Sequence, residues 1–213
     1  MLITTLFLSG IVWAQETSET LTSCLNKNYP DYVIFLSDKK IDSVFYYANT
    51  SIAPVIFKVN KYKLYPNKQL ESIADILRRI QQDTIIRLSH VWVGGSASPE
   101  GPPSWNYRLG EYRSRALADF LLQETGIPES KLKVENLCED WYSFEVALKN
   151  GAQIPNKSKV LDILAKETDN ERRKKQIKAL DGGYTWQRII QDVFPPFRNA
   201  RIAIVCLEKQ FPL

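Results

Sequence analysis

The sequence predicts a mixed α/β (α+β) fold in which helices pack on a mixed β-sheet. Short β-branched and aromatic runs alternate with helical segments along the 213 residues. Hydrophobic residues make up 44% of the chain and aromatic residues 11%, which is enough for a packed core. The sequence has no self-similar period and no low-complexity stretch. We therefore expect neither a repeat architecture nor a long linker.

The first fourteen residues, Met1 to Ala14, predict a signal peptide. They form an uncharged apolar run that is too short to span a bilayer, and polar residues follow from Gln15. Val12 and Ala14 suit the small-residue positions before a cleavage site. A buried N-terminal strand is the alternative. We expect an exported chain with no transmembrane segment after cleavage.

The sequence pattern in the middle of the chain predicts alternating strands and helices. Three β-rich runs are expected at 32–35, 44–47 and 55–59. Pro66-Asn67 opens a helix, and an apolar strand from Thr84 to Val93 ends at two glycines. The next helix begins near Ser104 and stops at Gly126. The residues expected on the buried sides of the two helices are Leu70, Ile73, Ile76, Leu77 and Ile80, then Leu109, Tyr112, Ala116, Leu117, Phe120 and Leu121.

After a short strand from Lys131 to Leu137, the pattern predicts a group of helices and a last strand. Asp140 is a good N-cap for the first of these helices. Two more helices begin at Asn156 and Asn170, and a short one lies between Trp186 and Val193. The final strand is expected over residues 201–207.

Charge and composition favour few functional classes. The 28 basic and 24 acidic residues leave a net charge of +4, which is too small to predict a nucleic-acid-binding protein. The basic run 172–175 has acidic neighbours and is expected to be a solvated helix face, the alternative being a nucleic-acid or lipid patch. A single histidine, His90, and the absence of a Ser/His/Asp set predict no enzyme, no metal and no cofactor.

The three cysteines form an odd set, so at least one thiol is free or pairs with another chain. Cys206 lies in an apolar run and is expected to be buried and inert. Leu21-Thr22-Ser23-Cys24 resembles a bacterial lipid-attachment box, but ten residues separate it from the apolar run. Lipidation of Cys24 is therefore the lesser alternative.

The segment from Gly95 to Gly101 predicts an anion-binding loop between a strand and a helix. Its glycines let the backbone approach a ligand closely, and the helix start supplies N–H donors. Arg113, two turns into the helix, adds a planar bidentate partner for a carboxylate. The alternative is that the glycines only turn the chain and that Arg113 pairs with Glu111 or Glu100 at the surface.

Several of these segments together resemble the OmpA-like peptidoglycan-binding domain. The most specific part is Asn106-Tyr107-Arg108-Leu109-Gly110-Glu111-Tyr112-Arg113-Ser114, and the resemblance covers roughly residues 52 to 138 and the final strand. The Ser-Pro-Glu-Gly loop at 98–101 is similar to a variant found in Bacteroidetes envelope proteins. The resemblance implies a βαβαβ two-layer sandwich over 52–213 with a helical insertion at about 140–195, preceded by an N-terminal extension with β-strands over 15–51.

In the family that this chain resembles, a loop Asp and a helix Arg hold the ammonium and the carboxylate of diaminopimelate in the peptidoglycan stem peptide. The Arg matches Arg113, and a helix-start Asn matches Asn106. The Asp position falls on Ser98, and Glu100 offers a replacement carboxylate. The ligand-binding residues expected on this basis are Ser98, Glu100, Asn106 and Arg113.

The resemblance implies an exported, non-catalytic envelope protein in the periplasm, associated with the outer membrane. Its expected partner is diaminopimelate-type peptidoglycan or another envelope protein. The alternative, motivated by Ser98 and the added helices, is an interaction protein of an envelope or surface assembly that has lost diaminopimelate binding.

Overall fold

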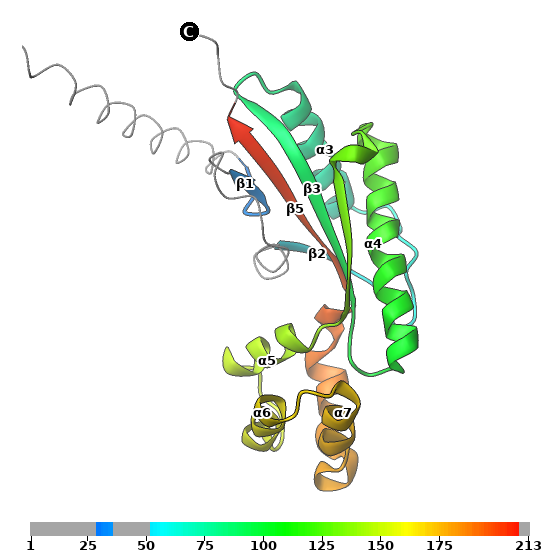
Figure 1. Ribbon diagram of the computed structural model, residues 1–213, viewed down its shortest axis with the longest axis vertical. Coiled ribbons are helices and arrows are strands. Elements are labelled where there is room, and N and C mark those ends of the chain that lie inside the picture. The colour runs from blue at the N-terminus through cyan, green and yellow to red at the C-terminus, as the bar shows by residue number, and fades with distance from the viewer. Residues whose placement is uncertain (1–28, 36–51, 209–213) are drawn as a thin grey trace, which may run out of the picture.

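The computed structural model describes residues 29–35 and 52–208 (Figure 1). It confirms the mixed α+β fold, with one five-stranded mixed sheet and helices packed against it. Residues 52–139 follow the expected order of strand, helix, strand, helix and strand. The signal peptide expected at 1–14, Cys24 and the strand expected at 44–47 lie outside the described residues.

The sheet is built around two long strands, β3 (Ile86–Ala97) and β5 (Asn199–Glu208), which pair antiparallel at its centre. On the other side of β3, strand β4 (Leu132–Glu139) runs parallel to it. On the other side of β5 lie β1 (Val33–Phe35), which is parallel to it, and β2 (Ile52–Ile56), which is antiparallel. The last strand in the sequence therefore lies in the middle of the sheet. Its apolar run suits this position, because a strand with neighbours on both sides is buried.

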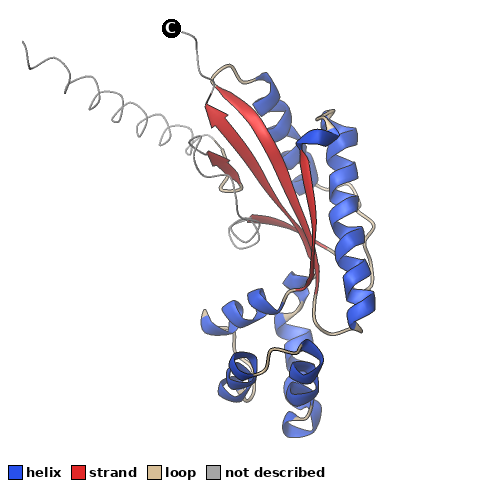
Figure 2. Ribbon diagram, viewed as in Figure 1, coloured by secondary structure: helices blue, strands red, loops and turns tan. Residues whose placement is uncertain are grey.

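Helices α3 (Lys68–Gln82) and α4 (Pro103–Thr125) cover one face of the sheet (Figure 2). The Asn67 side chain caps α3 by accepting hydrogen bonds from the N–H groups of Gln69 and Leu70, both at 3.0 Å. The predicted helix face is confirmed, because its apolar residues pack with those of β3 and β5 in one core. The residues of α3 in this core are Leu70, Ile73, Ile76, Leu77 and Ile80.

Residues 141–197, between β4 and β5, form a set of short helices that we call the helical group. The structure places them at one end of the sheet, where α5, α6 and α7 gather below α4 (Figure 1). They have their own apolar core, which includes Phe144, Ile177 and Phe194. Asp140 caps α5 as predicted, by accepting from the N–H of Ser143 at 3.1 Å. The helices are α5 (Trp141–Lys149), α6 (Lys157–Lys166), α7 (Asn170–Lys178), η2 (Leu180–Gly183), α8 (Tyr184–Arg188), η3 (Ile189–Val193) and η4 (Pro195–Phe197), and η1 (Glu129–Lys131) precedes β4.

The structure corrects three expectations from the sequence. Strand β3 runs through both glycines to Ala97, because β4 continues the pairing as far as Ala97 and Glu139. Tyr112, predicted on the buried side of α4, is 38% exposed and packs against Tyr62 instead, with the two rings tilted by 47° and their centroids 4.8 Å apart. Lys174, predicted on a solvated face, is buried, because its ammonium has acidic and carbonyl partners inside the molecule.

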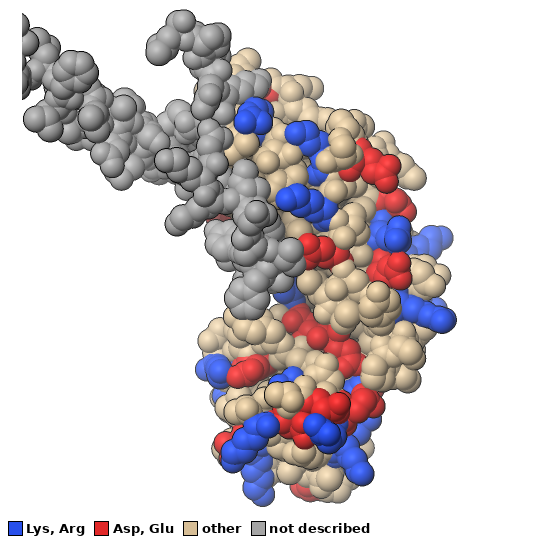
Figure 3. Space-filling view, viewed as in Figure 1, with Lys and Arg blue, Asp and Glu red and all other residues tan. Residues whose placement is uncertain are grey.

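The charged surface is mixed on the face shown in Figure 3. Lys and Arg side chains alternate there with Asp and Glu side chains over the helical group at the lower end. Arg172, in the basic run of α7, pairs with Glu167 at 2.9 Å. On this face the basic residues are therefore interspersed with acidic ones, so they form no concentrated basic patch. No helix among the described residues is both long enough and apolar enough to cross a bilayer.

Candidate ligand-binding site

The predicted loop connects the end of β3 to the start of α4. The strand ends at Ala97, and residues 98–101 turn the chain, with the N–H of Glu100 bonded to the carbonyl of Ser98 at 2.8 Å. Prolines occupy the N-cap and the first position of α4, so neither Pro102 nor Pro103 has an N–H to offer a ligand. The expected contribution of free N–H groups from the helix start is therefore smaller than the sequence pattern suggested.

Arg113 extends from α4 beneath this turn and is almost completely buried, with 1% of its surface exposed. Its guanidinium donates hydrogen bonds to three backbone carbonyls, those of Ser96 at 2.7 Å, Lys61 at 3.1 Å and Lys58 at 3.4 Å. It also lies 5.3 Å from the ring centre of Phe57. Among the described residues, none offers it a carboxylate within ion-pair distance. The structure therefore rules out the alternative in which Arg113 pairs with Glu111 or Glu100, because these two acids pair with Arg115 and Arg198.

Burial lowers the pKa of Arg113 from its ordinary 12.5 to about 10, and the nearby charge of Arg198 adds to this shift. Glu100 acts in the opposite direction but too weakly to cancel it. At neutral pH the group remains a cation, held in a place where its charge is poorly solvated.

Glu100 points into the same region, but its carboxylate already has a partner. Arg198 binds it with two parallel hydrogen bonds, each 3.0 Å long. The Ser98 hydroxyl donates to Glu100 Oε1 at 3.1 Å. The carboxylate that the sequence offered for a ligand ammonium is therefore neutralised inside the protein.

Asn106 holds the loop from the helix side. Its side-chain amide donates to the carbonyl of Gly101 at 3.1 Å and to Glu139 Oε1 at 2.7 Å. Lys174 binds the same carbonyl at 2.9 Å and the same carboxylate oxygen at 3.0 Å. The loop end is thus fixed by α4, by the end of β4 and by α7 together.

These residues surround one small cavity of about 160 Å³. All four residues predicted from the sequence line it, and Arg198 completes the charged part of the lining. The remaining lining is largely apolar. The residues are Val59, Asn60, Ala97, Ser98, Glu100, Gly101, Pro102, Trp105, Asn106, Leu109, Arg113 and Arg198.

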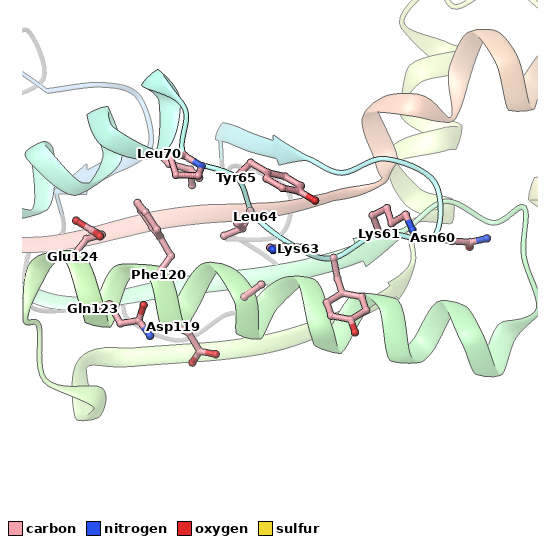
Figure 4. A pocket seen from close by; sticks show the side chains of 13 residues that line it. Asn60, Lys61, Lys63, Leu64, Tyr65, Leu70, Asp119, Phe120, Gln123 and Glu124 are labelled. Atoms are coloured by element: carbon pink, nitrogen blue, oxygen red, sulfur yellow. The ribbon is translucent and has the colours of Figure 1, made fainter.

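A larger hollow of about 760 Å³ lies between α4 and the segment that leads into α3 (Figure 4). Leu64 and Tyr65 face Phe120 across it, while Asp119 and Gln123 lie at its rim. Its charged residues are all exposed, so none of them requires a counter-ion. The smaller cavity differs in this respect because it adjoins a buried cation.

Sequence reasoning missed Arg198, Glu139 and Lys174 as parts of this region. Arg198 is 98 residues from Glu100 in the chain, and Lys174 is 35 residues from Glu139. Neither distance corresponds to a local motif. The signals available in the sequence were two segments that resemble the same envelope variant as the Ser-Pro-Glu-Gly loop, Glu139-Asp140-Trp141 and Phe194-Pro195-Pro196-Phe197-Arg198.

No group of three or more His, Cys, Asp and Glu side chains within the described ranges is placed to hold a metal ion. The cavity contains carboxylate and guanidinium groups that are paired or hydrogen-bonded to the backbone. What this arrangement can do chemically is hold a small anion.

Comparison with known proteins gives weak global similarity only. No family model and no curated protein matches the sequence. Among solved structures, the peptidoglycan-associated lipoprotein of Burkholderia pseudomallei is 14% identical, with a TM-score of 0.38 over 71% of this chain and 88% of that one. The C-terminal domain of Helicobacter pylori MotB is 15% identical, with a TM-score of 0.35 over 76% of this chain and 88% of that one. At this level we carry over neither residue roles nor function.

Proposed function

We propose that this chain is an exported, non-catalytic protein of the cell envelope that binds peptidoglycan through a carboxylate of the stem peptide. The carboxylate binds beside Arg113 in the small cavity under the loop at 98–101. The signal-peptide pattern of residues 1–14 supports export, and the resemblance of 106–114 to the OmpA-like motif supports the periplasm and the outer membrane as its location.

A single observation carries the proposal. Arg113 is a buried cation beside a cavity, and no carboxylate of the described residues pairs with it. A buried charge without a counter-charge is unfavourable, so an anionic ligand at this place would stabilise the complex. Three of the five N–H donors of the guanidinium bind backbone carbonyls, which leaves two for a ligand.

The test is co-sedimentation of the purified chain with insoluble sacculi that contain diaminopimelate. We expect the wild-type chain to pellet with the sacculi and Arg113→Ala or Arg113→Lys to remain in the supernatant, because lysine lacks the planar fork. The matched control is Arg115→Ala, two residues further along α4, where the side chain is exposed and pairs with Glu111 at 3.3 Å.

Since Arg113 also binds three carbonyls, the fold of each variant is checked by circular dichroism before the assay. Wild-type chain that stays in solution, or folded Arg113 variants that pellet as well as wild type, would contradict the proposal.

A second function is favoured by one observation, the tight connection of the loop to the helical group. Arg198 and Lys174 bind the two carboxylates nearest the loop, so the region is firmly held without any ligand. This arrangement suits an interaction protein of an envelope or surface assembly that has kept the fold and lost the ligand. Amide resonances of residues 98–113 that do not shift when a diaminopimelate-containing peptide is added would favour this second function.

A further inference from the structure

The ion pair between Glu100 and Arg198 lies in the wall of the small cavity, together with Arg113. The charged side chains of its lining are Glu100, Arg113 and Arg198, so two cations face one anion and the local charge is 2 − 1 = +1. The single anion is bound on both of its oxygens by Arg198. The cavity therefore attracts a negative group and has no unpaired acid for a positive one.

The hydroxyl of Ser98 adds to the preference of the cavity for a ligand without an ammonium group. Its hydroxyl hydrogen is directed to Glu100, so the hydroxyl oxygen keeps its lone pairs for one incoming N–H donor. A neutral amide N–H suits such an acceptor. An ammonium ion would instead have to share the cavity with two guanidinium groups, with only a neutralised carboxylate to offset the repulsion.

We propose that this cavity selects an anionic group with no free ammonium beside it, such as a stem-peptide carboxylate whose neighbouring amine has been acylated in a cross-link. Arg198 is the specificity-determining residue, because it removes the one carboxylate that would bind an ammonium. This residue lies directly after η4, so the helical group sets the ligand preference of the loop. The inference rests on the proposed function.

The test compares two forms of one muropeptide, a disaccharide-tripeptide ending in diaminopimelate, with its side-chain amine either free or acetylated. Affinities for the full chain are measured by isothermal titration calorimetry. We expect the wild-type chain to bind the acetylated form more tightly than the free amine. Arg198→Met frees Glu100 and is expected to shift the ratio of affinities at least tenfold towards the free amine.

The matched control is Arg188→Met, which removes a guanidinium from the same helical group where it pairs with Asp192 at the surface. This variant should keep the wild-type ratio. Glu100→Gln is a second variant, in which both guanidinium groups stay and the one carboxylate is lost, so the ratio should shift further towards the acetylated form.

The outcomes separate the two proposals. If the wild-type chain binds the free amine as tightly as the acetylated form, or more tightly, this inference is wrong and peptidoglycan binding stands. If neither form binds, the proposed function is wrong and the inference fails with it. An unchanged ratio in folded Arg198→Met would overturn the role given to Arg198.

Discussion

Individual residues in this chain are held by partners that are distant in sequence. Arg113 connects α4 to the end of β3 and to the segment after β2, because its three carbonyl acceptors belong to those two regions. A side chain in this position organises the loop even before any ligand arrives. Its presence in the cavity lining was predictable from the motif spacing, whereas its three backbone partners were not.

The cysteine in β5 behaves as its sequence context predicts. Cys206 is fully buried, and burial raises the pKa of its thiol to about 12. Such a thiol is protonated at physiological pH and is a poor nucleophile. The apolar run around it was sufficient to predict this, because burial in a central strand follows from local composition.

His90 makes the stability of the fold depend on pH. Burial lowers its pKa from the ordinary 6.5 to about 4, with help from the charges of Lys133 and Lys131. Below pH 6.5 the unfolded chain binds a proton at this residue, while the folded chain does so only near pH 4. Stability is therefore lost as the pH falls from about 6.5 to about 4.

We expect the wild-type chain to lose about 1–2 kcal/mol more than His90→Gln between pH 7 and pH 4.5. The measurement is urea unfolding at the two pH values. The acidic residues of the chain contribute to the pH dependence of both proteins alike, so only the difference between them reports on His90. Parallel losses in the two proteins would show that His90 does not titrate differently on folding.

At the scale of elements, the helices were easier to predict than the end of the central strand. The apolar spacing of α3 and its Asn67 cap are local features, so they could be read directly from the sequence. The pair of glycines in β3 looked like a strand end. In the structure the strand continues through them, because β4 pairs with it as far as Ala97. The missing side chain at Gly95 lets α4 lie close to the sheet.

Strand β3 and helix α4 lie very close together at Gly95. A Cβ atom placed there would lie 2.0 Å from the carbonyl oxygen of Gly110 and 2.5 Å from the backbone nitrogen of Ser114. Backbone atoms of a helix cannot yield by that amount without moving the helix. We expect Gly95→Ala to lower the free energy of unfolding by about 3 kcal/mol or more.

The control for this prediction is Gly126→Ala at the C-cap of α4. Gly126 has a φ of 65° and no atom within 4 Å of an added Cβ, so only backbone strain of about 1 kcal/mol is expected. Both variants are compared with wild type by urea unfolding. A smaller loss for Gly95→Ala than for Gly126→Ala would mean that the helix does not lie against the strand as described.

At the scale of the whole molecule, the sheet with α3 and α4 and the helical group have separate apolar cores. Charged and polar contacts near the loop join them. Arg201 in β5 binds Asp140 and Ser143 at the start of α5. Local patterns predicted the apolar face of α3 in the first core but not these contacts, because their partners are brought together only when β4 and β5 pair with β3.

The pair between Lys174 and Glu139 is the contact that most directly couples α7 to the loop. Both side chains are 5% exposed, and the Nζ to Oε1 distance is 3.0 Å. Lys174→Met would leave the Glu139 carboxylate buried with only Asn106 and Trp141 as partners. Because a buried charge that loses its counter-ion is strongly unfavourable, we expect a loss of about 3 kcal/mol in the free energy of unfolding.

A double-mutant cycle tests whether this loss belongs to the pair. Glu139→Gln removes the charge and keeps a similar shape, so adding it to Lys174→Met should recover part of the stability and give a coupling energy above about 1.5 kcal/mol. The exposed pair of Arg115 and Glu111 serves as the control cycle, for which we expect a coupling below about 0.5 kcal/mol. If the two cycles give equal couplings, then apolar packing, and not this buried ion pair, holds the helical group against the loop. The polar contacts left between the helical group and the loop would then be those of Arg198 with Glu100 and of Lys174 with the Gly101 carbonyl.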